Sequence, residues 1–389
     1  MAGILRGHSR AIRSLLVLIL LPVALLACTR PNRTTFRSVH AGERHTCAID
    51  TSGSAWCWGA NRFGQLGDGT NIGRKHPAHV IGGHAFTTLA LGFTHTCGID
   101  VAGDVWCWGG NFVGNLGDGT TDPSVGPVRV EGLPGAADAV SATSDRSCAI
   151  VARGLWCWGD NTQNVMGAGP RGPLLTATEI LATGVTGHAV GPGKACTIAT
   201  RVLCVGIDID RAGSGGEFAG SVIEGLPDEK LDPIEEIDVA QFISCARTGS
   251  GRVFCWGNLP WFIEENGELQ EGVWFKAKEL PTLPVSMLTT MEATICALVR
   301  GEVVCRGKLP GQGWVHSGGI GAPMVDASNL GEPWVIPFPG KVLDVSGGYA
   351  YICAVVEGGQ VWCSGSNSDG QLGDGGTTDS LDPVRTSSR

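Results

Sequence analysis

The stretch His45–Thr70, HTCAIDTSGSAWCWGANRFGQLGDGT, decides the fold because it returns along the chain. It recurs almost letter for letter at His95–Thr120, as HTCGIDVAGDVWCWGGNFVGNLGDGT, and again from Ile352 as ICAVVEGGQVWCSGSNSDGQLGDGGT. A pattern that returns at a near-constant spacing indicates an architecture of equivalent structural units. We therefore expect one repeat-built body, although the length alone would suggest two or three domains.

Each copy has the pattern of a β-hairpin that carries two cysteines. In the first copy, two short apolar runs flank the polar segment 50–54, and Gly53 suits the left-handed position of a three-residue loop. A loop of that length places Cys47 opposite Cys57 on antiparallel strands, where both residues point to one face and lie close enough for a disulfide. The hairpin geometry therefore predicts a disulfide within each copy.

This cysteine pair can be followed through seven copies. Successive first cysteines lie 48 to 57 residues apart, whereas the two members of a pair are only 8 to 10 residues apart. Zinc binding is the competing interpretation, but structural zinc sites usually contain CxxC-type knuckles, and the sequence has none. Fourteen of the fifteen cysteines are then used, and Cys28 is left over. The predicted disulfides are Cys47–Cys57, Cys97–Cys107, Cys148–Cys157, Cys196–Cys204, Cys245–Cys255, Cys296–Cys305 and Cys353–Cys363.

The first 27 residues have the pattern of an export signal. Three arginines precede an uncharged, mostly apolar run from Ser14 to Ala27, which is short for a membrane span. The run ends Leu25-Leu26-Ala27-Cys28, which resembles a bacterial lipobox, where the cysteine is diacylated and becomes the new N-terminus. The alternative is ordinary signal cleavage with Cys28 left as a free thiol. Export agrees with the predicted disulfides, which persist in oxidising compartments.

We therefore expect a lipid-anchored protein of the bacterial cell envelope. By resemblance to lipoprotein sorting, Thr29 after the cysteine favours the outer membrane. The formal charge of −9 disfavours nucleic-acid binding, which relies on clustered lysines and arginines. Sixty glycines and twenty prolines interrupt any long helical periodicity. The predicted organisation is a signal peptide at 1–27, a lipidated tether at 28–35 and one repeat-built domain at 36–389.

Strand-like segments on either side of each hairpin complete the unit. Phe86–Leu91 and 341–345 precede hairpins, and 127–130 and 383–385 follow the GQLGDGT loops. Four short strands make a propeller blade, and seven such blades bury their faces against each other. The chain begins with one strand in excess, Phe36–Val39, and ends one strand short. We therefore expect an all-β, seven-bladed β-propeller of four-stranded antiparallel blades, its ring closed by this N-terminal strand in the sheet of Cys353 and Cys363.

The pattern AGxxHTCAI…GxxWCWGxNxxGQLGDGT resembles the regulator of chromosome condensation repeat, which forms seven-bladed propellers. The resemblance covers about residues 36–389 and is strongest in the first three copies and the last. Copies four to six depart from it, since the GQLGDGT loop is replaced there and Arg306 stands where tryptophan is expected. A secreted relative, beta-lactamase-inhibitory protein II, implies that such rings also act outside cells. The nucleotide exchange and chromatin binding of the nuclear member are not expected for an exported lipoprotein.

Two replacement loops are the candidate partner-binding regions. Both the 258–284 and 310–339 segments follow a second cysteine strand, so they leave the ring from the same face as the GQLGDGT loops. Asn266-Gly267 predicts an extra hairpin in the first of them. Insertions on one face of a repeat protein often mark its binding face, and aromatic residues dominate interface energetics. The alternative is that these aromatic residues fold back to cap their own blades. The candidates are Trp261, Phe262, Trp274, Phe275, Trp314 and Trp334.

The other polar and aromatic positions have structural interpretations. His45 and His95 occupy one repeat position, which favours local hydrogen bonding over catalysis. The aspartates of the LGDG loops, one per loop, favour turn chemistry over calcium, which needs six or more oxygens. Paired tryptophans flank a cysteine on one strand face and should fill the gap between blades. These residues are Asp68, Asp118 and Asp374, with Trp56/Trp58, Trp106/Trp108 and Trp156/Trp158.

No catalytic motif stands out, because the sequence has no HExxH, Walker loop or GxSxG. No catalytic residue, metal or cofactor is therefore expected. The favoured function is a non-enzymatic, monomeric scaffold that binds an unidentified envelope protein through the loops of one face. The alternatives are an inhibitor of a secreted enzyme, and a hydrolase or lyase whose site lies in the central channel.

Overall fold

The computed structural model describes residues 34–162, 166, 169–207, 217–241, 243–258, 273–280, 284–291, 294–307 and 333–387. Thr34–Arg389 form one compact unit. The predicted signal peptide, tether residues up to 33 and Cys28 lie outside the described residues. Within the described ranges, no helix is long and apolar enough to cross a membrane.

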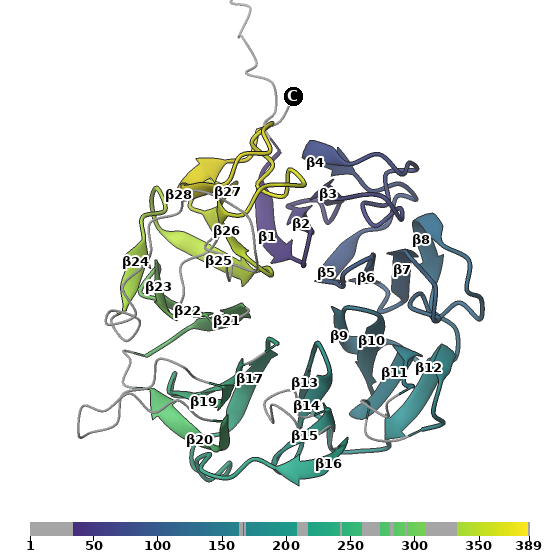
Figure 1. The fold of residues 1–389 in the computed structure, drawn as a ribbon, viewed down its shortest axis with the longest axis vertical. Helices are drawn as coiled ribbons and strands as arrows, with labels where there is room; N and C mark the ends of the chain where they lie inside the picture. Colours follow the sequence, from purple (N-terminus) through teal and green to yellow (C-terminus); the bar gives the residue numbers. More distant parts are fainter. Residues whose placement is uncertain are drawn as a thin grey trace, which may run out of the picture. The chain divides into compact units, whose positions relative to one another are not determined.

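Seven four-stranded antiparallel sheets make up the described part of the chain, as predicted (Figure 1). We number the sheets as blades 1 to 7 in chain order. Their strands are β1 Phe36–Ala41, β2 His45–Asp50, β3 Ala55–Gly59 and β4 Arg74–His79 in blade 1; β5 Phe86–Leu91, β6 His95–Asp100, β7 Val105–Gly109 and β8 Ser124–Arg129 in blade 2; β9 Ala137–Thr143, β10 Arg146–Val151, β11 Gly154–Asp160 and β12 Pro173–Leu181 in blade 3; β13 Gly187–Gly191, β14 Lys194–Ile198, β15 Val202–Ile207 and β16 Glu217–Val222 in blade 4; β17 Ile234–Val239, β18 Ile243–Thr248, β19 Val253–Asn258 and β20 Val273–Leu280 in blade 5; β21 Met287–Met291, β22 Thr294–Val299, β23 Glu302–Gly307 and β24 Trp334–Ile336 in blade 6; and β25 Val342–Gly347, β26 Tyr351–Val356, β27 Gln360–Gly365 and β28 Ser380–Arg385 in blade 7.

The hairpin register follows the sequence pattern. Cys47 faces Cys57 and Ile49 faces Ala55, and Gly53 in the turn between β2 and β3 has a φ of 92°. A side chain at such a positive φ is strained, so glycine is the residue that this turn accommodates. The same opposed cysteines recur in each blade, and all seven predicted disulfides are present in the structure.

The first strand of each blade is its innermost one. Around the ring, each of these strands packs against the first strands of its neighbours, from β1 through β5, β9, β13, β17, β21 and β25 back to β1. Because the strands are antiparallel, the first and third strands of each blade end on the same side of the ring. We call this side the loop face; it carries the turns between first and second strands and the connections between third and fourth strands. The second-to-third hairpins lie on the opposite side.

The predicted closure of the ring is wrong. The Phe36–Val39 segment belongs to β1, which pairs with β2 of its own blade, and the last sheet has its own four strands, β25 to β28. The segment 380–385, which includes the strand predicted at 383–385, is the fourth strand of this sheet, so the sheet has no place for Phe36–Val39. Every blade is therefore made from one contiguous stretch of chain.

Side-chain hydrogen bonds close the ring instead of a shared strand. The backbone N–H of Val39 donates to Asp344 of β25 at 2.8 Å, and that of Ala41 donates to Ser346 at 3.0 Å. The same device joins blades 5 and 6, where the N–H of Thr290 donates to Asp238 at 2.6 Å. An innermost strand has a free backbone edge, and buried N–H groups need partners. These side chains supply them.

The apolar core lies between the blades. Trp58, Trp108 and Trp158 are fully buried, and each packs in one apolar cluster with the disulfide of the preceding blade. Their strand neighbours Trp56, Trp106 and Trp156 share the same face but are only partly buried. The prediction that at least one tryptophan of each pair fills the space between blades is confirmed.

Each buried tryptophan donates a hydrogen bond to a backbone carbonyl of the preceding blade, which fixes the distance between the two blades. Nε1 of Trp108 donates to the carbonyl of Gln65 in the preceding blade at 2.9 Å, and Oγ1 of Thr96 donates to the same carbonyl at 2.8 Å. The proton of Thr96 is thus used, so Nε2 of His45, 2.8 Å from that oxygen, is the donor. His95 repeats the contact with Ser147 at 2.7 Å. These histidines are structural, as predicted, but they bond the next blade rather than their own.

Candidate binding face and channel mouth

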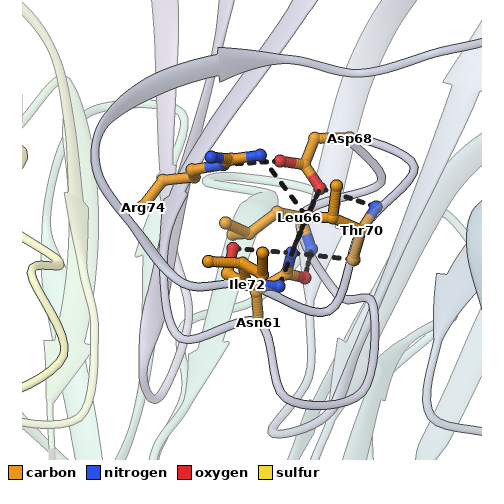
Figure 2. A network of polar contacts seen from close by, with 6 residues as sticks. All are labelled: Asn61, Leu66, Asp68, Thr70, Ile72 and Arg74. Atoms are coloured by element: carbon orange, nitrogen blue, oxygen red, sulfur yellow. Dashed lines mark hydrogen bonds and ion pairs between the residues drawn. The ribbon is translucent and has the colours of Figure 1, made fainter.

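The GQLGDGT loops are held by their own side chains (Figure 2). The amide nitrogen of the buried Asn61 donates to Asp68 at 3.1 Å and to the carbonyls of Thr70 and Ile72, while its oxygen accepts from the N–H of Leu66. Asn111 and Asn367 make the equivalent bonds to Asp118 and Asp374. One asparagine therefore organises each complete loop.

The loop aspartate takes part in turn chemistry. Oδ1 of Asp68 accepts from the N–H and hydroxyl of Thr70 at 3.0 and 2.7 Å, and Oδ2 accepts from Nε of Arg74 at 2.7 Å. Burial acts to raise the pKa of Asp68, but these hydrogen bonds outweigh it and the pKa is lowered. Both oxygens thus have partners within the loop, which agrees with the predicted structural role.

A cavity opens on the loop face at the mouth of the central channel. Its volume is ≈ 470 Å³. Turns from six of the seven blades line it, together with part of the blade 7 loop; the blade 6 turn, residues 292–293, lies outside the described residues. The lining residues are Glu43, Arg44, Phe93, Ser144, Pro192, Gln241, Tyr349, Ala350, Ser366, Ser368, Asp369 and Gln371.

One repeat position supplies a lining residue from each of these six blades. It is the residue that follows the glycine of AGxxHTC or its equivalent, at the end of the innermost strand. The residue before it is glycine in blades 1, 2, 4 and 7, whereas this position and the one after it hold a different side chain in each of the six blades. A position needed only for folding would tend to repeat, as the buried tryptophan does. The six residues are Glu43, Phe93, Ser144, Pro192, Gln241 and Tyr349.

Two aromatic rings at this position are accessible. Phe93 is 37% exposed and Tyr349 is 44% exposed. A further ring, Phe112 in the blade 2 loop, is 56% exposed and makes an edge contact with Phe63 of blade 1, their centroids 5.2 Å apart. Sequence reasoning missed these residues because the repeat was matched on its shared letters. The signal that could have found them was the variable pair inside AGxxHTC.

The charged groups of the mouth are mutually engaged. Arg44 makes two hydrogen bonds to the carboxylate of Asp369, at 2.8 and 3.0 Å, and so connects blade 1 to the blade 7 loop. Glu43 accepts a hydrogen bond from the hydroxyl of Ser144 at 3.2 Å, across the intervening blade 2. Burial raises the pKa of Glu43, and the hydrogen bonds from Ser144 offset part of that effect. Polar and aromatic residues therefore alternate around the mouth, with Tyr349 of blade 7 and Phe93 of blade 2 on either side of the charged residues of blade 1.

The aromatic residues predicted in the two replacement loops are only partly placed. Trp261, Phe262 and Trp314 lie outside the described residues, as does the hairpin predicted at 266–267. Trp274 and Phe275 lie on β20, which is the outer strand of blade 5 and not part of a projecting loop. Trp334 lies on β24 and packs against the apolar core between blades 6 and 7. This packing is what the capping alternative expects of Trp334, and its contact with a partner stays a prediction.

Among the described residues, one group has the proximity expected of metal ligands. Sγ of Cys148, Sγ of Cys157 and a ring nitrogen of His188 all lie within 4.8 Å of one another. The two cysteines are bonded to each other, so neither offers a thiolate. The group as it stands is a histidine against a disulfide.

Models of the regulator of chromosome condensation (RCC1) repeat match the chain at residues 36–65, 52–99, 86–115, 102–150 and 342–371. These matches cover blades 1 and 2, the first two strands of blade 3 and most of blade 7. The disulfide and the loop asparagine occur together in all four blades, whereas the buried tryptophan of blades 1 to 3 is replaced by Ser364 in blade 7. Residues 36–150 and 342–371 therefore contain RCC1 repeats. Blades 4 to 6 keep the disulfide and the four-stranded sheet, although the repeat models do not match them.

Several solved structures share the fold of this chain. Human WBSCR16 is 17% identical with a TM-score of 0.70, over 86% of this chain and 94% of that one. Yeast RCC1 (Prp20), solved bound to Kap60, is 16% identical with a TM-score of 0.54, over 90% and 74%. The CRINKLY WD40 ectodomain of the Arabidopsis thaliana receptor kinase ACR4 is 17% identical with a TM-score of 0.51, over 85% and 95%. At these identities the likeness concerns the fold alone. The comparison with curated proteins gave no match.

Proposed function

We propose that this chain is a non-enzymatic, monomeric protein-binding scaffold that recognises its partner through the channel mouth and the surrounding loop face. The observation that carries the proposal is the variable repeat position at the mouth, where six blades contribute six different side chains around one cavity. The disulfide and the four-stranded sheet recur in all seven blades. The residues that face the mouth differ from blade to blade on this common frame.

The points where the two replacement loops leave and rejoin their blades also favour the loop face as the binding surface. The connection from β19 to β20 begins at Asn258 and ends at Val273, and that from β23 to β24 begins at Gly307 and ends at Trp334. Both therefore start and finish on the loop face, around the mouth. Yeast Prp20p, a propeller of this fold that is 17% identical with a TM-score of 0.53, has binding properties to Gsp1p and histones. That precedent supports protein binding as the use of such a ring, and leaves the partner of this chain to experiment.

Site-specific photo-crosslinking tests the proposal within one blade. A crosslinking amino acid at Phe93, on the mouth, should capture one recurrent envelope protein in cells. The same residue at Val101, which is 73% exposed in the β6–β7 hairpin on the opposite side, is the matched control and should not. Equal capture from both positions would contradict recognition by the mouth. Capture of one soluble secreted enzyme from Phe93 would favour the inhibitor alternative.

We further propose that the scaffold is held at the bacterial outer membrane by lipid on Cys28. The support is the sequence Leu25-Leu26-Ala27-Cys28 after a basic and apolar start, and the fact that Cys28 is the one cysteine outside the seven disulfides. An acyl anchor holds a protein at a bilayer without a membrane-spanning helix.

Replacing Cys28 with serine should abolish incorporation of an alkyne-palmitate label and move the protein from the membrane fraction to the soluble one. Disulfide content and propeller stability should be unchanged, because the substituted residue lies outside the ring. Undiminished labelling of the Cys28→Ser protein, or a membrane-bound serine variant, would contradict the anchor.

A further inference from the structure

The position occupied by His188 is apolar in the six other blades. It lies on the innermost strand, one residue before the partner of the first cysteine of its own blade. In each of the six other blades the equivalent side chain packs in one apolar cluster with the disulfide of the preceding blade. The equivalents are Val39, Leu89, Val140, Ile237, Leu288 and Val345.

His188 brings two polar atoms into this apolar position. Its ring lies against the Cys148–Cys157 disulfide of blade 3, whose cysteines are buried. Neither Nδ1 nor Nε2 has a hydrogen-bond partner among the described residues. Burial lowers the pKa of His188 to about 3, so the ring is neutral and offers one N–H donor and one acceptor nitrogen. Unpaired buried polar groups of this kind destabilise the state that contains them.

Reduction of the adjacent disulfide would supply the missing partners. A thiol S–H can donate to the acceptor nitrogen of His188, and the second sulfur can accept from its N–H. An aliphatic side chain at the same place gains nothing when its disulfide opens. The dithiol form is therefore stabilised in blade 3 relative to the other six blades.

We infer that Cys148–Cys157 is a reversible redox site, the most readily reduced of the seven disulfides, and that His188 is its positioning residue. The co-reactant is a dithiol. Its thiolate attacks one cysteine sulfur, the S–S bond breaks, and the leaving sulfur takes a proton from solvent. The second thiol of the reductant then attacks the reductant's sulfur in the mixed disulfide, and the remaining cysteine leaves and takes up a proton. Two electrons and two protons have then passed to the protein, and the reductant has become a cyclic disulfide.

Equilibration in dithiothreitol redox buffers, followed by differential alkylation and peptide mass spectrometry, measures all seven disulfides in one molecule. Cys148–Cys157 should be half reduced at a reductant ratio about tenfold lower than its neighbours, equivalent to a potential about 30 mV higher. His188→Val installs the residue found at positions 39, 140 and 345, and should return this disulfide to the range of the others.

The reciprocal substitution separates the histidine from the general stability of blade 3. Val345→His places an imidazole against Cys296–Cys305, which lies in one cluster with Val345. That disulfide should then become about tenfold easier to reduce, with Cys353–Cys363 unchanged as the internal control. The inference is overturned if Cys148–Cys157 is reduced together with the other six, if it stays ahead of them in His188→Val, or if Val345→His has no effect.

Discussion

Replacing Trp108 with alanine should lower the free energy of unfolding of the propeller by about 3–5 kcal/mol. The side chain is fully buried and packs against the Cys47–Cys57 disulfide and Leu66 of the preceding blade. Its removal leaves a large cavity between two blades, next to Phe86, whose ring centroid lies 5.5 Å from that of Trp108. Chemical denaturation followed by near-ultraviolet circular dichroism measures the loss.

Two controls on the same strand separate packing from hydrogen bonding. Trp108→Phe keeps most of the volume and loses only the bond to the Gln65 carbonyl, which retains its bond from Thr96, so about 1 kcal/mol should be lost. Trp106→Ala removes a partly exposed ring and should destabilise the protein less than Trp108→Ala does. Equal losses for the two alanine variants would contradict the assignment of the core to the space between blades.

Acidification from pH 7 to pH 4 should destabilise the ring by several kcal/mol. Burial lowers the pKa of His45 and His188 to about 3, and that of His40 and His95 to about 4, from the ordinary value of 6.5. A depressed histidine pKa contributes stability that is complete above pH 6.5 and is lost as the pH falls toward the folded value. At about 1.4 kcal/mol per unit, each group contributes on the order of 2–3 kcal/mol of this loss by pH 4.

Buried carboxyls oppose the histidines over the same range; burial also raises the pKa of Glu43 and Glu236, and the two largest shifts are those of Asp238 and Asp344. Burial raises the pKa of Asp238 and Asp344 to about 6, so their contribution is complete below about pH 4 and is lost as the pH rises through 6. Two groups shifted by about two units do not offset four groups shifted by about three. The histidines therefore determine how the free energy of unfolding depends on pH, and this free energy rises between pH 4 and pH 6.5.

Calorimetric melting temperatures between pH 7.5 and pH 4 measure this slope. His95→Gln keeps a nitrogen donor toward Ser147 but cannot take up a proton, so it should flatten the profile. His79→Gln changes an exposed histidine on β4 and serves as the matched control for the number of histidines. A melting temperature that is unchanged down to pH 4 in the parent protein would contradict the account.

The repeat pattern predicted the fold because its signals are local. The separation of Cys47 from Cys57, with Gly53 in the turn between them, sets the hairpin register, and this register repeats in all seven blades. The buried tryptophans and the aspartates of the loops were likewise predictable from alternation and turn chemistry. These features depend on neighbours within a few residues or on the next copy of the same motif.

The remaining features depend on residues that the pattern does not share. Ring closure was mispredicted because Phe36–Val39 was counted as an extra strand, although it is the first strand of blade 1 and the strand after the last loop, β28, already completes blade 7. The channel mouth was missed because it consists of the variable letters of the repeat, brought together only when six blades converge. The unusual role of His188 became visible when the register aligned it with six aliphatic residues.

Construction from contiguous blades has a consequence for how such a protein can change in size. Duplication or deletion of one blade-length stretch of the gene would add or remove a whole sheet without leaving an unmatched strand at either end. The contacts between the first and last sheets, such as that from the N–H of Val39 to Asp344 and that from the N–H of Ala41 to Ser346, would have to form at a slightly different angle. A ring sealed by an exchanged strand would have to cut that sheet at fixed points in the gene, whereas this one is free to vary its number of units.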